Sequence, residues 1–493
     1  MYQVQGKNNV YEVVIGCEIH AQIATNSKLF SRSAIAFGAS PNSQVSLVDV
    51  AFPGMLPTIN IEAVYQTVKT GLGIGAKINS VSVFDRKNYF YPDLPQGYQI
   101  SQYLHPLVGE GELEIAFQNE KKELVKKTIG IERIHLEQDA GKSIHDQHPQ
   151  LSLIDLNRSG IALMEIVSKP HLSSPQEASE YVRTVRSLLR CLKTSDADME
   201  KGNLRCDANV SVRVVGSKIL GTRCEIKNLN SMRNIARAIE FEAKRQVQLL
   251  ESGQQIKQET RLFDAVNGET RALRSKEDAM DYRYFPDPDL PKLVLEQAII
   301  DEIKQNLPEL PWLKKARYIK QYNISEYDAG VLTAEEEISQ YFEQLIAHHE
   351  PKLCVSWLTV ELFGRMNKLN IDFANLNLPA SHLIELLSLI KSGEISGKIA
   401  KDVLDTMLET NKKASIIVQE KGLKQVSDSS ALIAIIKKVI INNQDNFAKC
   451  VAGDQKLFGF FIGQIMKETK GQANPQLINK LLQEEINSIK KPE

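Results

Sequence analysis

The sequence predicts an α+β protein, in which an N-terminal domain with a mainly antiparallel sheet and flanking helices is followed by a helical domain and a helical tail. In the first part of the chain, several segments alternate strictly between polar and apolar residues, the pattern of a strand with one buried face. After about residue 293, apolar residues recur at helical spacing. The expected domains are therefore residues 1–293, 294–410 and 411–493.

The first long strand is expected over residues 11–22, YEVVIGCEIHAQ. Its polar side carries Glu18 and His20, whose Cα atoms lie about 7 Å apart along a strand. A carboxylate and an imidazole at this spacing can bind one divalent ion. An exposed edge strand with an ordinary histidine has the same pattern, and this segment alone favours that second interpretation.

A loop-rich stretch over residues 26–60 and a helix over residues 60–71 are expected next. Residues 85–102 then combine basic, aromatic and proline residues, with Lys87 beside Tyr89 and Tyr91. Such a mixture can stack an unpaired base and bind its phosphates. A rigid aromatic loop that packs on the core has the same composition, and the residues alone favour neither interpretation.

Another strand with a charged side is expected over residues 133–142, RIHLEQDAGK. His135, Glu137 and Asp139 share its polar side. Lys142 follows a glycine, so its ammonium group is placed where it could bind a phosphate.

An unusual carboxylate follows in residues 151–168. Arg158 lies in the polar first part of this segment, and Glu165 interrupts the mostly apolar strand that comes after it. A lone carboxylate in an apolar run is costly to bury unless it is paired or metal-bound. Glu165 is therefore the acid that most strongly suggests a function.

Residues 198–231 predict two further strands that each have a charged side. Arg205 and Asp207 lie on that side of the first strand, and Glu225 and Lys227 lie on that side of the second. Arginine, lysine and acidic side chains so close together form a polar surface suited to a metal ion and phosphates.

Two helices and a basic, aromatic segment complete the N-terminal domain. A serine cap followed by proline begins a helix at residue 174, and a second helix is expected over residues 231–251. Both have an apolar stripe that suits them to cover the sheet. Residues 260–290 contain Tyr282 and Arg283 and resemble residues 85–102 in composition.

The C-terminal part is expected to consist of helices in two pieces with a joint near residue 410. Lysines gather around its glycine-containing turns. They fit either a solvated surface or contacts with the phosphates of an RNA. The candidates for RNA contact are Lys398, Lys401, Lys412 and Lys413.

The overall composition is that of an ordinary globular protein of several domains. The chain has 493 residues and a formal net charge of −1, which argues against non-specific binding to duplex nucleic acid but leaves room for an RNA held by local patches. No apolar run reaches the roughly 18 residues that span a bilayer, and no signal peptide is present, which predicts a cytoplasmic location. The six cysteines form no CxxC pair, so we expect buried, reduced cysteines and no zinc site.

Acidic and histidine side chains from separate segments would converge if the predicted strands share one sheet. Like charges at such proximity destabilise a fold unless a cation lies among them. Oxygen ligands with at most one histidine favour Mg²⁺ or Mn²⁺ over zinc, and Lys142, Arg205 and Lys227 would favour a nucleotide phosphate bridged by that ion. Neither a P-loop nor a kinase glycine loop is present. The residues therefore predict metal-dependent phosphoryl transfer.

Several motifs resemble those of a known family, the B subunits of the tRNA-dependent amidotransferase. These motifs are IGCEIH, DRKNYFYPDLPQGYQIS, HLEQDAGK, DLNRSG, MEKGNLRCDANVS, EIKNLNS, DYRYFPDPDL and GQIMKETKGQANP. They occur in order over nearly the whole chain, which makes the resemblance highly specific. Three small departures are Cys17, Gln138 and Ala162, which stand where the family usually has a larger aliphatic residue, Glu and Pro.

The resemblance implies a cradle domain, a helical domain and a YqeY-like tail. It implies a ligase in which ATP phosphorylates the side-chain carboxylate of Glu or Asp on tRNA(Gln) or tRNA(Asn), and ammonia from a partner A subunit displaces the phosphate. A small C subunit would clamp the two larger ones, and the helical and tail domains would hold the tRNA.

Residue roles follow by motif position and by inference from the chemistry of each side chain. Metal binding is expected at Glu18, His20, Glu137, Glu165, Asp207 and Glu225, of which Glu137 and Glu225 are also expected to be catalytic. ATP or its phosphates are expected at Lys142, Arg205 and Lys227. The tRNA end is expected at Lys87, Tyr89, Tyr91, Arg158, Tyr282 and Arg283.

Two other functions remain open at this point. The chain could be a tRNA-binding scaffold whose acidic residues are only structural. It could also be a free-standing ligase that uses ammonium directly. Whether the chain is active without partners separates the second alternative from the family's scheme.

Overall fold

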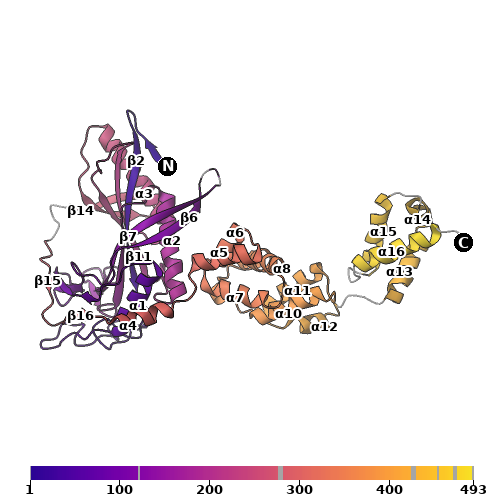
Figure 1. Cartoon of the computed structure of the whole chain (residues 1–493), viewed down its shortest axis with the longest axis horizontal. Helices are drawn as coiled ribbons and strands as arrows, with labels where there is room; N and C mark the ends of the chain where they lie inside the picture. The colour runs from indigo at the N-terminus through magenta and orange to yellow at the C-terminus, as the bar shows by residue number, and fades with distance from the viewer. Residues whose placement is uncertain are drawn as a thin grey trace. The chain divides into compact units, whose positions relative to one another are not determined.

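The computed structural model describes residues 2–119, 121, 123–275, 281–423, 429–451, 455–469 and 475–490. The chain forms two compact units, Met1–Pro311 and Trp312–Glu493. Among the described residues, all strands belong to the first unit, and the second consists of helices (Figure 1). This arrangement confirms the predicted α+β class with a helical C-terminal part.

The first unit is built on a nine-stranded sheet. Along the sheet the strands are β14 (Glu269–Ser275), β13 (Glu259–Asp264), β12 (Cys224–Lys227), β11 (Leu204–Val214), β2 (Val10–Gln22), β10 (Ala162–Ser168), β7 (Leu124–Gln138) and β6 (Gly111–Gln118), and β1 (Gln3–Gln5) pairs with β2. Only β12 and β13 pair in parallel among these neighbours. The mainly antiparallel sheet is therefore confirmed.

Helices cover one face of this sheet. α2 (Pro175–Leu192) and α3 (Met232–Glu251) run along it, and α1 (Ile61–Gly73) packs against α2 (Figure 1). Val13, Ile15, Cys17 and Ile19 of β2 point into this layer and are at most 1% exposed. The alternating strands therefore bury their apolar side under the helices and leave the polar side on the opposite, open face.

The strand predicted over residues 133–142 ends earlier than expected. β7 stops at Gln138, and Lys142 begins a separate strand, β8 (Lys142–Ile144), which pairs with β9 (Leu153–Asp155). Gly141 explains the break, because its amide donates to the carbonyl of Asp93 at 2.8 Å and a Cβ atom there would lie 2.9 Å from that oxygen. The prediction of one continuous strand was wrong because it overlooked this close backbone contact.

The two basic, aromatic segments lie side by side. β15 (Phe285–Pro286), β4 (Asp85–Asn88) and β5 (Tyr98–Ser101) form a small sheet in that order. The side-chain amide of Asn88 donates to the carbonyls of Tyr282 and Arg283, at 3.0 and 2.8 Å. Two further short strands, β3 (Val81–Ser82) and β16 (Leu293–Val294), pair with each other. Aromatic residues far apart in the sequence thus gather in one place.

The helical part of the chain has two separate apolar cores. The first is formed by α5 (Pro311–Tyr322), α6 (Glu326–Leu332), α7 (Glu336–Ile346), α8 (Pro351–Val355), η2 (Ser356–Leu362), α9 (Phe363–Leu369), η3 (Phe373–Asn375), α10 (Ala380–Lys391), α11 (Gly397–Thr410) and α12 (Ala414–Glu420). The second is formed by α13 (Ser429–Ile441), α14 (Gln444–Val451), α15 (Gln455–Glu468) and α16 (Pro475–Lys490). The two separate cores agree with the prediction that the helical part of the chain consists of two pieces.

The boundaries at residues 293 and 410 stay predictions. α4 (Gln297–Gln305) packs on α1 within the first unit, and α12 shares the core of α10 and α11. All six cysteines are free and buried, as expected. Within the described residues, no helix is both long and apolar enough to cross a membrane.

Candidate functional site

The open face of the large sheet carries the acidic residues that the sequence analysis selected. Residues directly opposite each other on paired strands project from the same face, so the strand register shows which side chains meet. The opposite pairs are Glu165 with His20, Glu165 with His135, Arg205 with His20, Asp207 with Glu18, and Asn209 with Glu225. Five strands therefore contribute to a single polar surface.

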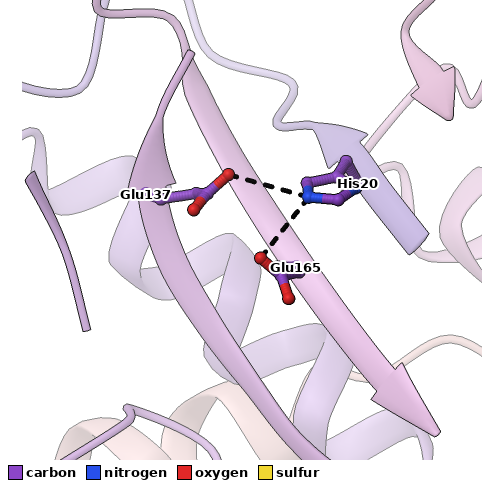
Figure 2. A group of neighbouring side chains, drawn as sticks. All are labelled: His20, Glu137 and Glu165. Atoms are coloured by element: carbon purple, nitrogen blue, oxygen red, sulfur yellow. Dashed lines mark ion pairs between the residues drawn. The ribbon is translucent and has the colours of Figure 1, made fainter. Parts of the chain in front are cut away.

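The tightest group on this surface consists of His20, Glu137 and Glu165, from β2, β7 and β10. The Nε2 atom of His20 lies 3.8 Å from an oxygen of Glu137 and 3.4 Å from an oxygen of Glu165 (Figure 2). One ligand atom from each residue lies within 4.8 Å of the other two. Three of the six predicted metal ligands thus point toward one another, at a separation that a single ion can bridge.

His135 also belongs to this group, although the sequence analysis gave it no role. Its Nε2 atom lies 3.3 Å from Glu165 and 3.9 Å from Glu137, and the residue is only 4% exposed. Its Nδ1 atom is buried and has no hydrogen-bond partner among the described residues. The signal was present in the sequence, because His135 shares the polar side of its strand with Glu137.

The charges in this group strongly perturb one another. Burial alone would lower the pKa of His135, but Glu165 and Glu137 outweigh it and raise that pKa to about 9. Burial alone would raise the pKa of Glu165, but His135 and His20 hold it well below its usual range. The pKa of Glu18 is raised by burial and by the carboxylates of Glu165 and Glu225. Buried carboxylates at this density call for a positive charge among them.

The other three predicted metal ligands lie on the same face but have partners of their own. Glu18 accepts a hydrogen bond from the Asn209 amide at 2.9 Å. Lys227 contacts Asp207 at 2.5 Å and Glu225 at 3.0 Å. Lys227, predicted to bind phosphate, therefore lies between two predicted metal ligands.

Glu225 is also held by a neighbouring strand. Thr260 of β13 donates to a carboxylate oxygen of Glu225 at 2.7 Å, and Thr260 is 8% exposed. The sequence analysis did not select Thr260, because no strand was predicted there. Its hydroxyl group fixes the orientation of the Glu225 carboxylate.

Arg205 lies at the edge of the acidic group and pairs with Asp139 at 2.7 Å. Lys142 and Arg158 lie elsewhere, since both line a second cavity of about 850 Å³. Arg158 also donates to the carbonyls of Ala140 and Gly141. The structure therefore does not bring Lys142 or Arg158 into the cavity that holds the acidic group, and their roles toward phosphate and tRNA stay predictions.

A cavity of about 630 Å³ opens over the acidic group. Four of the residues predicted to bind the tRNA end line it, together with five charged residues and both histidines, His20 and His135, of the polar face. These four are Lys87, Tyr89, Tyr91 and Tyr282, and the cavity is also lined by Tyr103 and Tyr284, which the sequence analysis did not select. Arg283 is exposed and is not among the lining residues.

The tyrosines of this cavity form a connected group. Tyr89 makes edge contacts with Tyr91 and Tyr282, and Tyr103 stacks on Tyr284 with ring centroids 4.4 Å apart. The ammonium group of Lys87 lies 5.1 Å from the centre of the Tyr282 ring. Aromatic faces beside a cation suit a flat base and its phosphate.

The four lysines predicted to contact the body of a tRNA are exposed on the helical unit. Two of them have carboxylate partners: Lys401 contacts Glu361 at 2.6 Å, and Lys412 contacts Glu420 at 2.8 Å. Lys398 and Lys413 form no ion pair with any residue that the structure describes. Contact with RNA stays a prediction for all four.

Known proteins match this chain over nearly its full length. A family profile described as "GatB/GatE catalytic domain" matches residues 13–301, and one described as "GatB domain" matches residues 340–486. A protein of Rickettsia rickettsii (strain Iowa), named as the B subunit of the aspartyl/glutamyl-tRNA(Asn/Gln) amidotransferase, is 56% identical over 488 residues, which are 99% of this chain and 100% of the relative. Proteins of the same name from Rickettsia bellii and Rickettsia felis are 56% and 55% identical, with the same coverage. The chain therefore belongs to the GatB/GatE family of tRNA-dependent amidotransferase subunits.

Proposed function

We propose that the chain acts in a glutamine-dependent amidotransferase that converts Glu-tRNA(Gln), Asp-tRNA(Asn) or both to the correctly charged Gln-tRNA(Gln) and Asn-tRNA(Asn). The relatives carry both tRNAs in their name. The observation that carries the proposal is that acidic residues, cations and tyrosines from distant segments line one cavity. These residues suit the binding of a carboxylate substrate, a nucleotide and the end of a tRNA.

Mg²⁺ and ATP fit the residues present. His20, Glu137 and Glu165 offer two carboxylates and an imidazole within bridging distance, and carboxylate oxygens are the ligands that Mg²⁺ prefers. Glu18, Asp207 and Glu225 supply further carboxylates along the same face. When bound, Mg²⁺ would neutralise the charge of the phosphates and polarise a phosphoryl oxygen.

The chain's own cations would position the reactants. Lys227 and Arg205 would hold the phosphates of ATP, while Lys87, Tyr89, Tyr91 and Tyr282 would hold the tRNA end. The side-chain carboxylate of the esterified Glu or Asp attacks the γ-phosphorus, ADP leaves, and an acyl phosphate forms. Ammonia then attacks the acyl carbon, phosphate leaves, and the amide remains. Orientation and charge neutralisation are the main tasks of a protein in such transfers.

The proposed assembly contains an amidase A subunit, which releases ammonia from glutamine, and a small C subunit. Lys398, Lys401, Lys412 and Lys413 would contact the body of the tRNA, with Lys401 and Lys412 exchanging their carboxylate partners for phosphates. We expect the assembly to act in the cytoplasm, where aminoacyl-tRNAs are used.

Replacing Glu225 with Gln tests the catalytic role against the scaffold alternative. In the complex reconstituted with its A and C subunits, we expect Glu225→Gln to lower ATP-dependent amidation of the misacylated tRNA about 100-fold, a loss typical of removing one preorganised charged group from a transition state. Affinity for the tRNA should stay within about twofold, because Glu225 belongs to the first unit and the lysines expected to contact the tRNA body belong to the second.

Glu12→Gln serves as the matched control. Glu12 lies on the same side of β2 as Glu18 but pairs with Arg213 and does not line the cavity. Amidation that survives in Glu225→Gln with tRNA binding intact would refute the catalytic role and leave the scaffold function. Amidation by the chain without its partners would instead identify a free-standing ligase.

A further inference from the structure

One positively charged residue on the wall of the large cavity has no partner. Arg133 lines this cavity together with Lys87 and Lys227. Lys227 forms ion pairs with Asp207 and Glu225, and the ammonium group of Lys87 lies over a tyrosine ring. The guanidinium group of Arg133, by contrast, forms no hydrogen bond, ion pair or ring contact with any residue that the structure describes.

The chemistry of this free guanidinium group indicates an anionic ligand. The Nε atom of Arg133 is buried and lacks a hydrogen-bond partner among the described residues. A buried donor without a partner is costly, so its position indicates a ligand atom. A guanidinium group is always charged and presents its N–H donors in one plane, which matches the two oxygens of a carboxylate. Arg133 is therefore suited to bind a carboxylate that enters the cavity.

The strand register places Arg133 beside the acidic group but apart from its carboxylates. Val167 lies opposite Arg133 on one side and opposite Glu18 on the other. Arg133 and Glu18 are thus two strands apart, with about 10 Å between their Cα atoms. His135 lies about 7 Å further along β7 and contacts Glu165. The charge of Arg133 is therefore not neutralised by the acids beside it.

Arg133 and the cations proposed to hold ATP lie on opposite sides of the acidic group. Arg205 and Lys227 are on β11 and β12, whereas Arg133 is on β7. The strands β2 and β10, which carry His20 and Glu165, lie between β11 and β7 in the sheet. A second anionic group of the substrates therefore finds a cation on the β7 side.

The aromatic part of the cavity packs on the strand that carries Arg133. Gln102 follows β5, and its side-chain oxygen accepts a hydrogen bond from the backbone amide of Leu136 in β7 at 3.1 Å. The next residue, Tyr103, lines the cavity and stacks on Tyr284. Arg133 and these aromatic residues therefore share the β7 side of the acidic group.

We propose that Arg133 binds the side-chain carboxylate of the Glu or Asp residue that is esterified to the tRNA. This inference rests on the proposed function. In that reaction the reacting carboxylate lies between the tRNA end and the γ-phosphate of ATP, and Arg133 is on the aromatic side of the acidic group, away from Arg205 and Lys227. A carboxylate that enters a cavity already rich in carboxylates is repelled unless a positive charge balances it, and Arg133 supplies that charge.

The same contact distinguishes the substrate from the product. Ammonia attacks the acyl carbon and loses a proton, phosphate leaves with its negative charge, and the side chain becomes a neutral amide. A guanidinium group binds a carboxylate through two charge-assisted hydrogen bonds, which an amide with a single oxygen cannot accept in the same way. Arg133 therefore favours binding of the misacylated tRNA and release of the corrected one.

Binding of three forms of one tRNA to the reconstituted complex tests this inference without turnover. The forms are the misacylated, the correctly charged and the uncharged tRNA, each titrated with Mg²⁺ present and with ATP and glutamine absent. The wild-type complex should bind the misacylated tRNA about 10-fold more tightly than the correctly charged tRNA, the usual contribution of hydrogen bonds to charged groups. Arg133→Gln should abolish this preference, and Arg133→Lys, which keeps the charge but loses the planar geometry, should retain part of it. Affinity for the uncharged tRNA should stay within about twofold in both variants, which would show that the complex is intact.

Steady-state kinetics of the same complexes separate the carboxylate from the other anions of the reaction. Arg133→Gln should raise the KM for the misacylated tRNA about 10-fold and leave the KM for ATP within about twofold. Arg213→Gln is the matched control, because Arg213 is on the same face of the sheet but pairs with Glu12 and does not line the cavity. The control variant should change neither constant.

Each other outcome assigns Arg133 differently. An equal loss of affinity for all three forms of the tRNA would assign it to a tRNA phosphate, and a rise in the KM for ATP alone would assign it to the nucleotide. Either result, or an unchanged preference for the misacylated tRNA in Arg133→Gln, would overturn the inference. A preference that depends on Arg133 would support it even if the wild-type complex failed to amidate tRNA, a failure that would refute only the proposed function.

Discussion

Replacing Glu165 with Gln is expected to reduce amidation by the reconstituted complex about 1000-fold, because the change removes a central ligand of the proposed ion. A bound metal contributes several kcal/mol to stabilising the charge of a transferring phosphoryl group, and each 1.36 kcal/mol changes the rate tenfold. Glu165 lies 3.4 Å from His20 and 3.3 Å from His135, so its carboxylate is shared by both imidazoles. The kcat for amidation at saturating ATP and tRNA measures the effect.

The matched control for this change is Glu114→Gln. Glu114 is on the outermost strand β6 and contacts the exposed Lys126. The Glu114→Gln variant should retain the wild-type kcat. Glutamine at 165 keeps the shape of the side chain, so melting temperatures close to wild type would confirm that the fold survives. If Glu165→Gln amidates at the wild-type rate, Glu165 does not bind a catalytic ion.

Replacing Glu242 with Ala is expected to destabilise the first unit by about 3–5 kcal/mol, the usual cost of breaking a buried ion pair from one side. Glu242 of α3 is fully buried and accepts hydrogen bonds from Arg245, Gln246 and Thr270. It also contacts Arg261 of β13 at 3.3 Å. Alanine would remove one of the two carboxylates that contact Arg245 and Arg261 and leave Glu259 alone to balance both guanidinium groups. The calorimetric transition of the N-terminal unit should shift to lower temperature.

The neighbouring Glu240 provides the control for Glu242. It is half-exposed and pairs with Lys244 on the helix surface, so Glu240→Ala should change stability little. An equally small effect of Glu242→Ala would show that the ion pairs of Glu242 make no net contribution to the free energy of unfolding. Glu242 lies next to β13, which carries Thr260. Replacing Glu242 should therefore also weaken the hydrogen bond by which Thr260 orients the Glu225 carboxylate.

Stability should depend on pH through Glu242 in a defined direction. Burial alone would raise its pKa, but hydrogen bonds and charge from Arg245 outweigh burial and lower the pKa below the ordinary 4.5. A carboxyl group with a lowered folded-state pKa stabilises the fold fully above its unfolded-state pKa. That contribution is lost as pH falls through the lower, folded-state value. The difference between wild type and Glu242→Ala should therefore shrink at acidic pH.

The polar face could be predicted because strand alternation is a local property of the sequence. Glu18 and Asp207 each stand on the polar side of an alternating run, and Glu165 was selected as a lone carboxylate in an apolar strand. The sheet brings all three to one face. Which acids would touch could not be predicted, because strand order and register are set by pairings between distant segments. In the structure, His20, Glu137 and Glu165 lie close enough together to share one ion, whereas Glu225 forms an ion pair with Lys227.

Other parts of the site could not be predicted, because no local sequence pattern indicates them. β13 and β14 lie in a stretch that shows charged and aromatic residues without clear alternation, so the hairpin and Thr260 were missed. Lys142 was expected near the acids because it follows Gly141 at the end of the predicted strand that carries Glu137 and Asp139. Close packing of that glycine against Asp93 turns the chain away, and Lys142 joins another cavity.

The measurement that most directly tests whether the acidic residues share one divalent ion is anomalous diffraction from crystals of the full chain soaked in Mn²⁺. We expect one strong peak at coordination distance from Nε2 of His20 and from carboxylate oxygens of Glu137 and Glu165. Crystals of Glu165→Gln should lose that peak. Manganese bound elsewhere in the wild type, or an empty position between these three side chains, would contradict the account.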